Sequence, residues 1–174
     1  KPKLQTLHDT YMKTLQAMKD DPHAYCRGLA DSPNISDAEM DDLNEKADAA
    51  LGAITLTTDV DQAFADADLV VEAITENVKA KEAFYTSIRD VLPEHALICT
   101  NSSTLLPSQM ADYTGRPDRF VATHFSNQIW RNNTAEIMGS PETSEETYRG
   151  AVEFVKDAGM IPLELKKEQP GYLL

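Results

Sequence analysis

The spacing of hydrophobic positions changes near residue 54, from a helical period to a strand-like one. Before this point, apolar residues recur every three or four positions in two segments, which predicts two amphipathic helices. The first runs from Leu4 to about Asp20, and the second begins at the capping box Ser36-Asp37-Ala38-Glu39 and continues to Leu51. Residues 22–36 between them are rich in proline, glycine and asparagine, so we expect a loop there.

After residue 54 the chain alternates between short apolar runs and helical segments. The predicted strands are 54–58, 69–74, 96–100, 119–123, 135–138 and 160–165. Helices are predicted at 59–64, from Ala80 until Pro93 ends the pattern, at 107–111, and from the second capping box Thr143-Ser144-Glu145-Glu146 to Gly159. This alternation predicts an α/β fold, with a mainly parallel sheet that has helices on both faces.

Composition and charge narrow the possible partners of the chain. The 174 residues are 41% hydrophobic and carry 29 acidic against 16 basic side chains, which gives a net charge of −13. Such a charge repels phosphate backbones and anionic lipids, so we expect no nucleic acid and no membrane partner. Cys26 and Cys99 lack any metal-binding or redox motif, which favours two free thiols in a reducing cytoplasm, with a disulfide between them as the alternative.

Polar side chains follow the predicted strands where each one ends. Glu76 follows the strand 69–74, Asn101 to Thr104 follow the next strand, and His124 to Asn127 follow the strand 119–123. One such turn alone is explained by local hydrogen bonding. Because ligands of parallel α/β sheets bind at the carboxyl ends of the strands, three such turns on one edge favour a binding site.

His124 is the strongest candidate for catalysis. Glu136 lies 12 positions later in the apolar run Ala135-Glu136-Ile137-Met138, where a carboxylate is costly to bury without a partner. An imidazole is a suitable partner, since a carboxylate orients a basic histidine and stabilises its protonated form. The alternatives are a hydrogen-bonded core histidine and an exposed glutamate on an edge strand. No histidine has metal-ligand spacing, so we expect no metal. Trp130, in the loop after His124, could either line a pocket or pack against the core.

Several separated motifs resemble those of the 3-hydroxyacyl-CoA dehydrogenase family. They are Ala67 to Lys81, Thr100 to Leu105, Asp118 to Asn127 and Pro170-Gly171-Tyr172, and they agree in order and spacing, including the interval from His124 to Glu136. The resemblance is good over 50–174 and loose before it. It implies a Rossmann-like NAD-binding domain over 1–168, with 169–174 beginning a link to a C-terminal helical domain.

The resemblance also implies roles for individual residues. His124 would be the general base that takes the proton of the substrate's 3-hydroxyl, and Glu136 would hold it. Ser103 and Asn127 would bind the substrate oxygen, and the cofactor-binding residues would be Glu76, Lys81, Asn101 and Ser103. The implied substrate is an (S)-3-hydroxyacyl-CoA of 3-hydroxybutyryl size, the cofactor is NAD, and the full-length protein would be a homodimer. Hydride chemistry would belong to the cofactor and proton transfer to the protein.

The chain departs from the family at two places. It has no Gly-x-Gly-x-x-Gly turn to hold a pyrophosphate, so we expect it to lack the family's first strand–glycine loop–helix–strand unit and, alone, to bind NAD weakly and be inactive. Ser126-Asn127-Gln128 stands where the family has Phe-Asn-Pro, which leaves open a carnitine or L-gulonate 3-dehydrogenase. A non-catalytic, lambda-crystallin-like structural protein is a further alternative, against which the presence of both His124 and Glu136 argues.

Overall fold

The computed structural model describes residues 2–173, which divide into two compact units. The helical unit comprises Lys1–Leu56 with Trp130–Asn132, and the sheet unit comprises Thr57–Ile129 with Asn133–Leu174. The assignment of 1–168 to one NAD-binding domain, with a link at 169–174, stays a prediction. Within the described range no helix combines the length and the apolar character needed to cross a bilayer.

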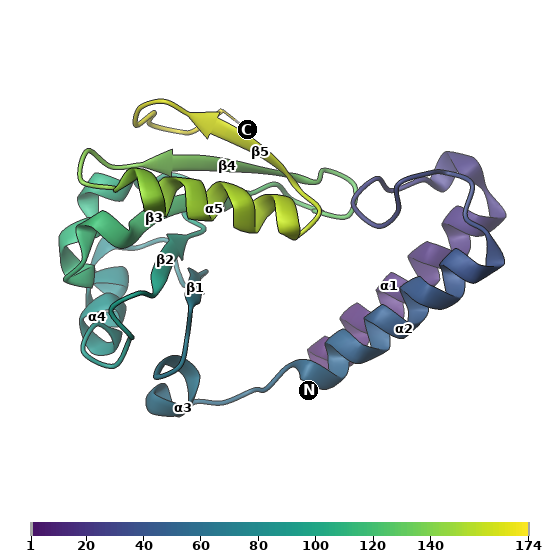
Figure 1. Ribbon diagram of the computed structural model, residues 1–174, viewed down its shortest axis with the longest axis horizontal. Helices are drawn as coiled ribbons and strands as arrows, with labels where there is room; N and C mark the ends of the chain where they lie inside the picture. The colour runs from purple at the N-terminus through teal and green to yellow at the C-terminus, as the bar shows by residue number, and fades with distance from the viewer. Residues whose placement is uncertain (1, 174) are drawn as a thin grey trace. The chain divides into compact units, whose positions relative to one another are not determined.

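The helical unit consists of a pair of long helices joined by a loop (Figure 1). The helices are α1 (Pro2–Asp20) and α2 (Asp37–Ala53), and the loop contains the short 3₁₀ helix η1 (Pro22–Ala24). The predicted start of α2 is confirmed, with Ser36 as its N-cap, because the Ser36 hydroxyl accepts the backbone N–H of Glu39 at 3.2 Å. The small core of this unit is formed by Leu15, Met18, Cys26, Ala30, Ile35 and Met40, with Trp130 packed against it.

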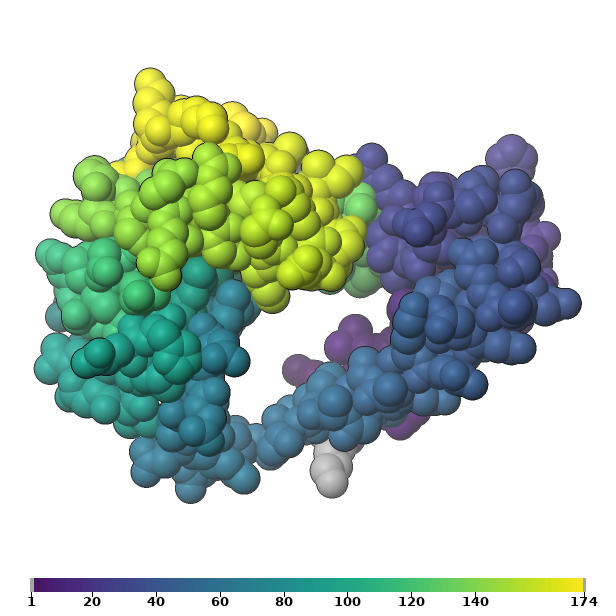
Figure 2. Space-filling view, viewed as in Figure 1, coloured from purple at the N-terminus to yellow at the C-terminus, as the bar shows by residue number. Residues whose placement is uncertain are grey.

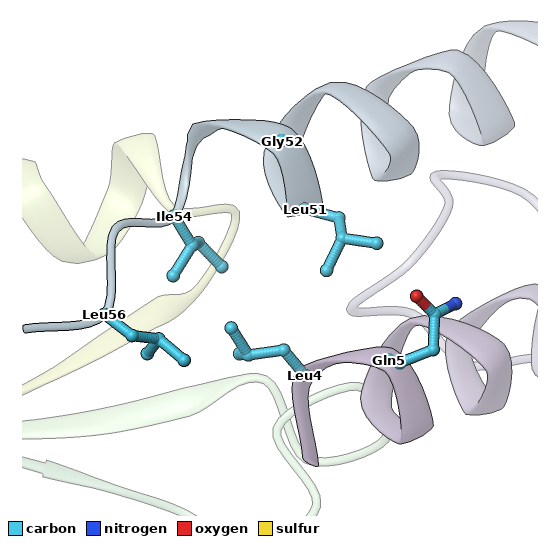
Figure 3. A pocket seen from close by; sticks show the side chains of 6 residues that line it. All are labelled: Leu4, Gln5, Leu51, Gly52, Ile54 and Leu56. Carbon is cyan, nitrogen blue, oxygen red and sulfur yellow. The ribbon is translucent and has the colours of Figure 1, made fainter. Parts of the chain in front are cut away.

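The predicted strand at 54–58 is wrong. These residues are extended but form no strand, because no other strand of the described chain lies beside them to complete their hydrogen bonds. The side chains of Ile54 and Leu56 instead point into an open pocket of about 320 Å³, which they share with Leu4 and Leu51 (Figure 3). The pocket has no titratable side chain in its lining, so it offers no group for proton transfer.

The sheet unit is built on five strands in the order β1-β2-β3-β4-β5. The strands are β1 (Leu69–Glu72), β2 (Leu97–Thr100), β3 (Phe120–Phe125), β4 (Thr134–Gly139) and β5 (Ile161–Leu165). β3 and β4 pair antiparallel, and the other neighbours pair parallel. The predicted α/β class and the mainly parallel sheet are therefore confirmed.

Helices cover both faces of this sheet, as predicted. They are α3 (Val60–Phe64), α4 (Val78–Ile88) and α5 (Glu145–Asp157), with the 3₁₀ helices η2 (Pro107–Gln109), η3 (Ala111–Thr114) and η4 (Pro117–Arg119). Successive side chains of a strand point to opposite faces, so Phe120 packs with Tyr85 of α4 and Val121 with Val152 of α5. Atoms of α5, drawn in yellow-green, cover the second of these faces in Figure 2.

Capping residues explain where the helices of the sheet unit begin and end. Asp59 caps α3, which confirms the helix predicted at 59–64, and Gly159 closes α5 with φ of 73°. The start of α5 is one residue later than its capping box indicated. Ser144 accepts the Thr147 N–H at 3.1 Å, whereas the Thr143 hydroxyl donates to the Phe120 carbonyl at 2.7 Å. Cys26 and Cys99 are buried free thiols, so the alternative of a disulfide between them is wrong.

Candidate active site

His124 lies inside strand β3, which ends two residues later than the sequence predicted. The predicted strand stopped at Thr123, but pairing with β4 extends β3 through Phe125. In this antiparallel ladder His124 is the direct cross-strand partner of Glu136. Side chains of such partners lie on the same face of the sheet, about 5 Å apart at Cβ, so the 12-residue interval brings the two side chains together.

His124 and Glu136 form a short hydrogen bond of 2.7 Å between the imidazole Nδ1 and the carboxylate Oε2. An ionised carboxylate can only accept, so the bond places the ring proton on Nδ1 and leaves the lone pair on Nε2. The ring forms no other hydrogen bond within residues 2–173, and 13% of the His124 side chain is exposed. Nε2 is therefore available to accept a proton from a bound molecule.

Glu136 is fully buried but well partnered. Its second oxygen, Oε1, accepts the backbone N–H of Leu173. Both carboxylate oxygens thus receive a donor, which offsets the free energy lost when a charge leaves water. The alternative of an exposed, unpartnered Glu136 is wrong. The Tyr172 ring completes the surroundings of the pair, with its centroid 5.0 Å from that of the His124 ring.

Glu76 organises the turn that follows β2. Its Oε1 accepts the Ser102 hydroxyl at 2.5 Å and the backbone N–H groups of Ser103 at 3.1 Å and Thr104 at 3.0 Å. Burial disfavours the charged form of Glu76, but these hydrogen bonds and the nearby Lys81 ammonium outweigh burial and lower its pKa to about 2. Glu76 therefore shapes the turn that carries Ser103, and its predicted contact with the cofactor stays a prediction.

Lys81 is buried, with its ammonium held between two carboxylates. Nζ lies 2.8 Å from each oxygen of Glu72 and 3.4 Å from Glu76. Glu72 also accepts the hydroxyls of Tyr85 at 2.6 Å and Thr100 at 2.8 Å. Burial opposes the ionisation of Glu72, but the Lys81 bond and these hydroxyls lower its pKa. The predicted role of Lys81 in cofactor binding is untested, and in this structure its ammonium faces protein carboxylates.

The sequence reasoning missed Glu72, although a signal for it was present. Glu72 is a carboxylate inside the apolar run 69–74, in the same way that Glu136 is a carboxylate inside another apolar run. Because a buried charge needs a partner, the same reasoning predicts a buried, partnered carboxylate at both Glu72 and Glu136.

Asn101 and Ser103 follow the carboxyl end of β2. The Oδ1 atom of Asn101 accepts the Phe125 N–H at 2.9 Å, which joins this turn to the residue after His124. Ser103 is exposed, and its hydroxyl makes no hydrogen bond within the described chain, so it is free to bind a ligand. Asn127 is exposed in the loop after β3 and already has a contact within the chain.

Trp130, which could have lined a pocket, packs instead. Its side chain contacts the core of the helical unit, and its carbonyl accepts the Gly28 N–H at 3.1 Å.

The described residues fit the hydride-accepting end of a dinucleotide cofactor but not its pyrophosphate. The exposed Ser103 hydroxyl and the unbonded Nε2 of His124 suit the end at which hydride moves, because they can bind and deprotonate an alcohol there. The strand-to-helix turns 73–77 and 101–106 contain no glycine, so neither lets a backbone approach a pyrophosphate closely. Residues 2–173 thus provide for proton transfer, and no phosphate cradle occurs among them.

Comparison with known proteins identifies the family. The model of the 3-hydroxyacyl-CoA dehydrogenase NAD binding domain matches residues 6–169. The chain belongs to this family. The match confirms the resemblance found from the sequence, indicates NAD as the cofactor, and agrees with the Rossmann-like arrangement of the sheet unit.

Curated relatives of this dehydrogenase family member are longer than the chain itself. The mitochondrial hydroxyacyl-coenzyme A dehydrogenase of Rattus norvegicus is 32% identical over 75% of the chain and 41% of the relative. A probable 3-hydroxybutyryl-CoA dehydrogenase of Deinococcus radiodurans is 33% identical over 78% of the chain and 48% of the relative. The chain therefore spans less than half the length of these relatives.

The chain is also similar to solved structures. A diketoreductase, described as acting on dicarbonyl compounds, is 38% identical with a TM-score of 0.76, over 98% of this chain and 54% of that one. The 3-hydroxybutyryl-CoA dehydrogenase of Escherichia coli is 28% identical with a TM-score of 0.69, over 73% of this chain and 26% of that one.

Proposed function

We propose that the protein is an oxidoreductase that interconverts an (S)-3-hydroxyacyl-CoA and the 3-oxoacyl-CoA with NAD. The observation that carries this proposal is the buried hydrogen bond between His124 and Glu136 at the carboxyl edge of the parallel strands. A base oriented by a carboxylate, with its second nitrogen open, is what removal of a hydroxyl proton requires. The presence of both His124 and Glu136 argues against a loss of chemistry, and so against the lambda-crystallin-like alternative.

The proton pathway follows from the tautomer of His124. In the oxidation, Nε2 takes the proton of the 3-hydroxyl, and Glu136 stabilises the imidazolium that forms. Ser103 and Asn127 are placed in this proposal at the substrate oxygen, where Ser103 brings an uncommitted hydroxyl. NAD, when bound, accepts the hydride from the carbon that carries the hydroxyl. In the reduction, His124 returns its proton to the same oxygen.

The substrate we propose is a short acyl-CoA, of the 3-hydroxybutyryl size. Support comes from relatives named for this substrate in Deinococcus radiodurans and Escherichia coli. The complete protein would act as a homodimer, which light scattering on the purified protein tests.

A second candidate is a dicarbonyl reductase whose substrate carries no CoA. It is favoured by the 38% identity to a diketoreductase over almost the whole chain. The sequence Ser126-Asn127-Gln128, close to His124, also departs from the Phe-Asn-Pro of the family pattern. Carnitine and L-gulonate belong to the same group of substrates without CoA.

A substrate comparison on the complete protein tests the proposal. Oxidation of NADH is followed with acetoacetyl-CoA, pentane-2,4-dione and dehydrocarnitine, and reduction of NAD⁺ with L-gulonate. A kcat/KM for acetoacetyl-CoA at least tenfold above the others supports the CoA substrate. A higher value for pentane-2,4-dione replaces it with the second candidate, and no turnover of any compound contradicts both.

A further inference from the structure

Residues 171–173 form a turn with an unusual backbone. Gly171 has φ of 78°, and Tyr172, which follows it, has φ of 56°. Glycine adopts such values freely, but a tyrosine rarely does, and residues held in this region cluster at functional sites. The backbone of the turn is fixed by the Tyr172 N–H, which donates to the Gln169 carbonyl at 3.1 Å.

The turn directs the Tyr172 side chain onto His124. Tyr172 is 4% exposed, and its ring lies 5.0 Å from the His124 ring at an angle of 60°. Its hydroxyl donates to the Leu105 carbonyl at 3.1 Å. One side chain therefore contacts the proposed base and is also bonded to the segment that carries Ser103.

The same turn directs a backbone donor at Glu136. The Leu173 N–H bonds to Oε1 of that carboxylate, while His124 occupies Oε2. A carboxylate held at both oxygens cannot rotate about its last bond without losing a donor. The position of the acceptor for Nδ1 is therefore set in part by residue 173, which lies 37 positions from Glu136 in the chain.

We propose that the turn 171–173 is a positioning element for the proton-transfer pair, and that Tyr172 is its positioning residue. Tyr172 limits tilting of the His124 ring, and Leu173 limits rotation of the Glu136 carboxylate. Together they hold the neutral ring in the Nδ1–H tautomer, with Nε2 aimed at the substrate oxygen. The expected effect on kcat rests on the proposed function. The expected effect on the tautomer of His124 holds whether or not that function is correct.

The decisive variant is Tyr172→Leu in the complete protein, with Tyr172→Phe as the conservative partner. Leucine keeps apolar bulk but removes the aromatic ring and the hydroxyl, whereas phenylalanine keeps the ring and loses only the hydroxyl, with its bond to Leu105 and its contact with Ser102. We expect Tyr172→Leu to lower kcat about 10- to 100-fold with KM changed less than about threefold, because a small displacement of a reacting group has an effect of this size. We expect Tyr172→Phe to stay within about threefold of the parent protein.

The ¹⁵N shifts of the His124 ring give a readout that does not depend on activity. We expect the Nε2–H tautomer to increase in Tyr172→Leu and not in Tyr172→Phe. Tyr148→Leu is the matched control, since the Tyr148 hydroxyl also donates to backbone carbonyls, of Ile137 and Leu165, but neither ring nor hydroxyl contacts the pair. Its His124 shifts should not move, even though it loses stability.

An unchanged tautomer and an unchanged kcat in folded Tyr172→Leu would overturn the inference. A tautomer that moves equally in Tyr148→Leu would also overturn it, because the effect would then follow general destabilisation. If the parent protein turns over none of the substrates, the proposed function fails, and the ¹⁵N measurement still decides the role of Tyr172.

Discussion

Glu72 and Lys81 form a buried ion pair beneath the turn that carries Ser103, with Nζ 2.8 Å from each carboxylate oxygen. Both side chains are almost completely buried, at 1% exposed. Removing one partner of such a pair leaves an uncompensated charge in a low-dielectric surrounding, which is among the larger single effects on stability. The pair therefore contributes to the position of the active-site turn through the fold, without touching a substrate.

Replacing Lys81 by Met should destabilise the protein by about 3–5 kcal/mol, because Glu72 loses the charge that compensates it. Urea denaturation measures the change in the free energy of unfolding. The control is Lys79→Met, on the exposed side of α4, which should change stability by less than about 0.5 kcal/mol. A Lys81→Met protein of unchanged stability but weakened NAD binding would contradict this expectation and would support the predicted role of Lys81 in cofactor binding.

Glu76→Gln should destabilise the protein in a pH-dependent way. The pKa of Glu76 is lowered to about 2, so its contribution is fully present above its ordinary value near 4.5 and is lost as the pH falls toward 2. The difference in urea midpoint between the parent protein and Glu76→Gln should be constant near pH 7 and shrink between pH 4.5 and 2. Glu82→Gln, at an exposed position of α4, is the control and should show no such trend.

His124→Asn and Glu136→Gln should each lower kcat about 10²- to 10⁴-fold, the range for loss of a general base or of its correct tautomer. Steady-state kinetics on the complete protein measure this, and KM should change little because neither residue supplies most of the binding. His95→Asn is the control, since the His95 side chain is exposed and pairs with Asp68 at the surface. Full activity of His124→Asn would exclude the proposed mechanism.

Ser102 and Ser103 should behave differently although they are neighbours. The Ser102 hydroxyl is buried against Glu76, so Ser102→Ala should lower thermal stability. The Ser103 hydroxyl has no partner within the described chain, so Ser103→Ala should leave the melting temperature unchanged and reduce kcat/KM about tenfold or more. Equal effects of both changes on stability, with no effect of Ser103→Ala on turnover, would remove Ser103 from the site.

Much of the fold followed from local patterns in the sequence. The capped start of α2 was predicted because it depends on residues close together in the chain. The helices on both faces and the mainly parallel sheet were predicted from the alternation of strand and helix patterns along the chain. The strand predicted at 54–58 failed for the opposite reason. Its β-branched residues suit a strand, but strand formation requires a neighbour, and propensity does not provide one.

The site was predictable in part, for the same physical reason. The pairing of His124 with Glu136 could be inferred, because a carboxylate in an apolar run needs a partner and the histidine was near in sequence. The contacts of Tyr172 with His124 and of Leu173 with Glu136 could not. They depend on a left-handed turn that brings back residues far along the chain, and no local pattern encodes where such a turn docks.

The antiparallel ladder between β3 and β4 makes the distance between His124 and Glu136 independent of the loop that connects the two strands. Backbone hydrogen bonds of the ladder fix the distance between the base and its carboxylate, whatever sequence connects the two strands. A change in the connecting residues 126–133, such as Ser126-Asn127-Gln128, therefore leaves the register of His124 with Glu136 unchanged. In the proposed enzyme this would let the loop vary with the substrate while the proton-transfer pair keeps its geometry.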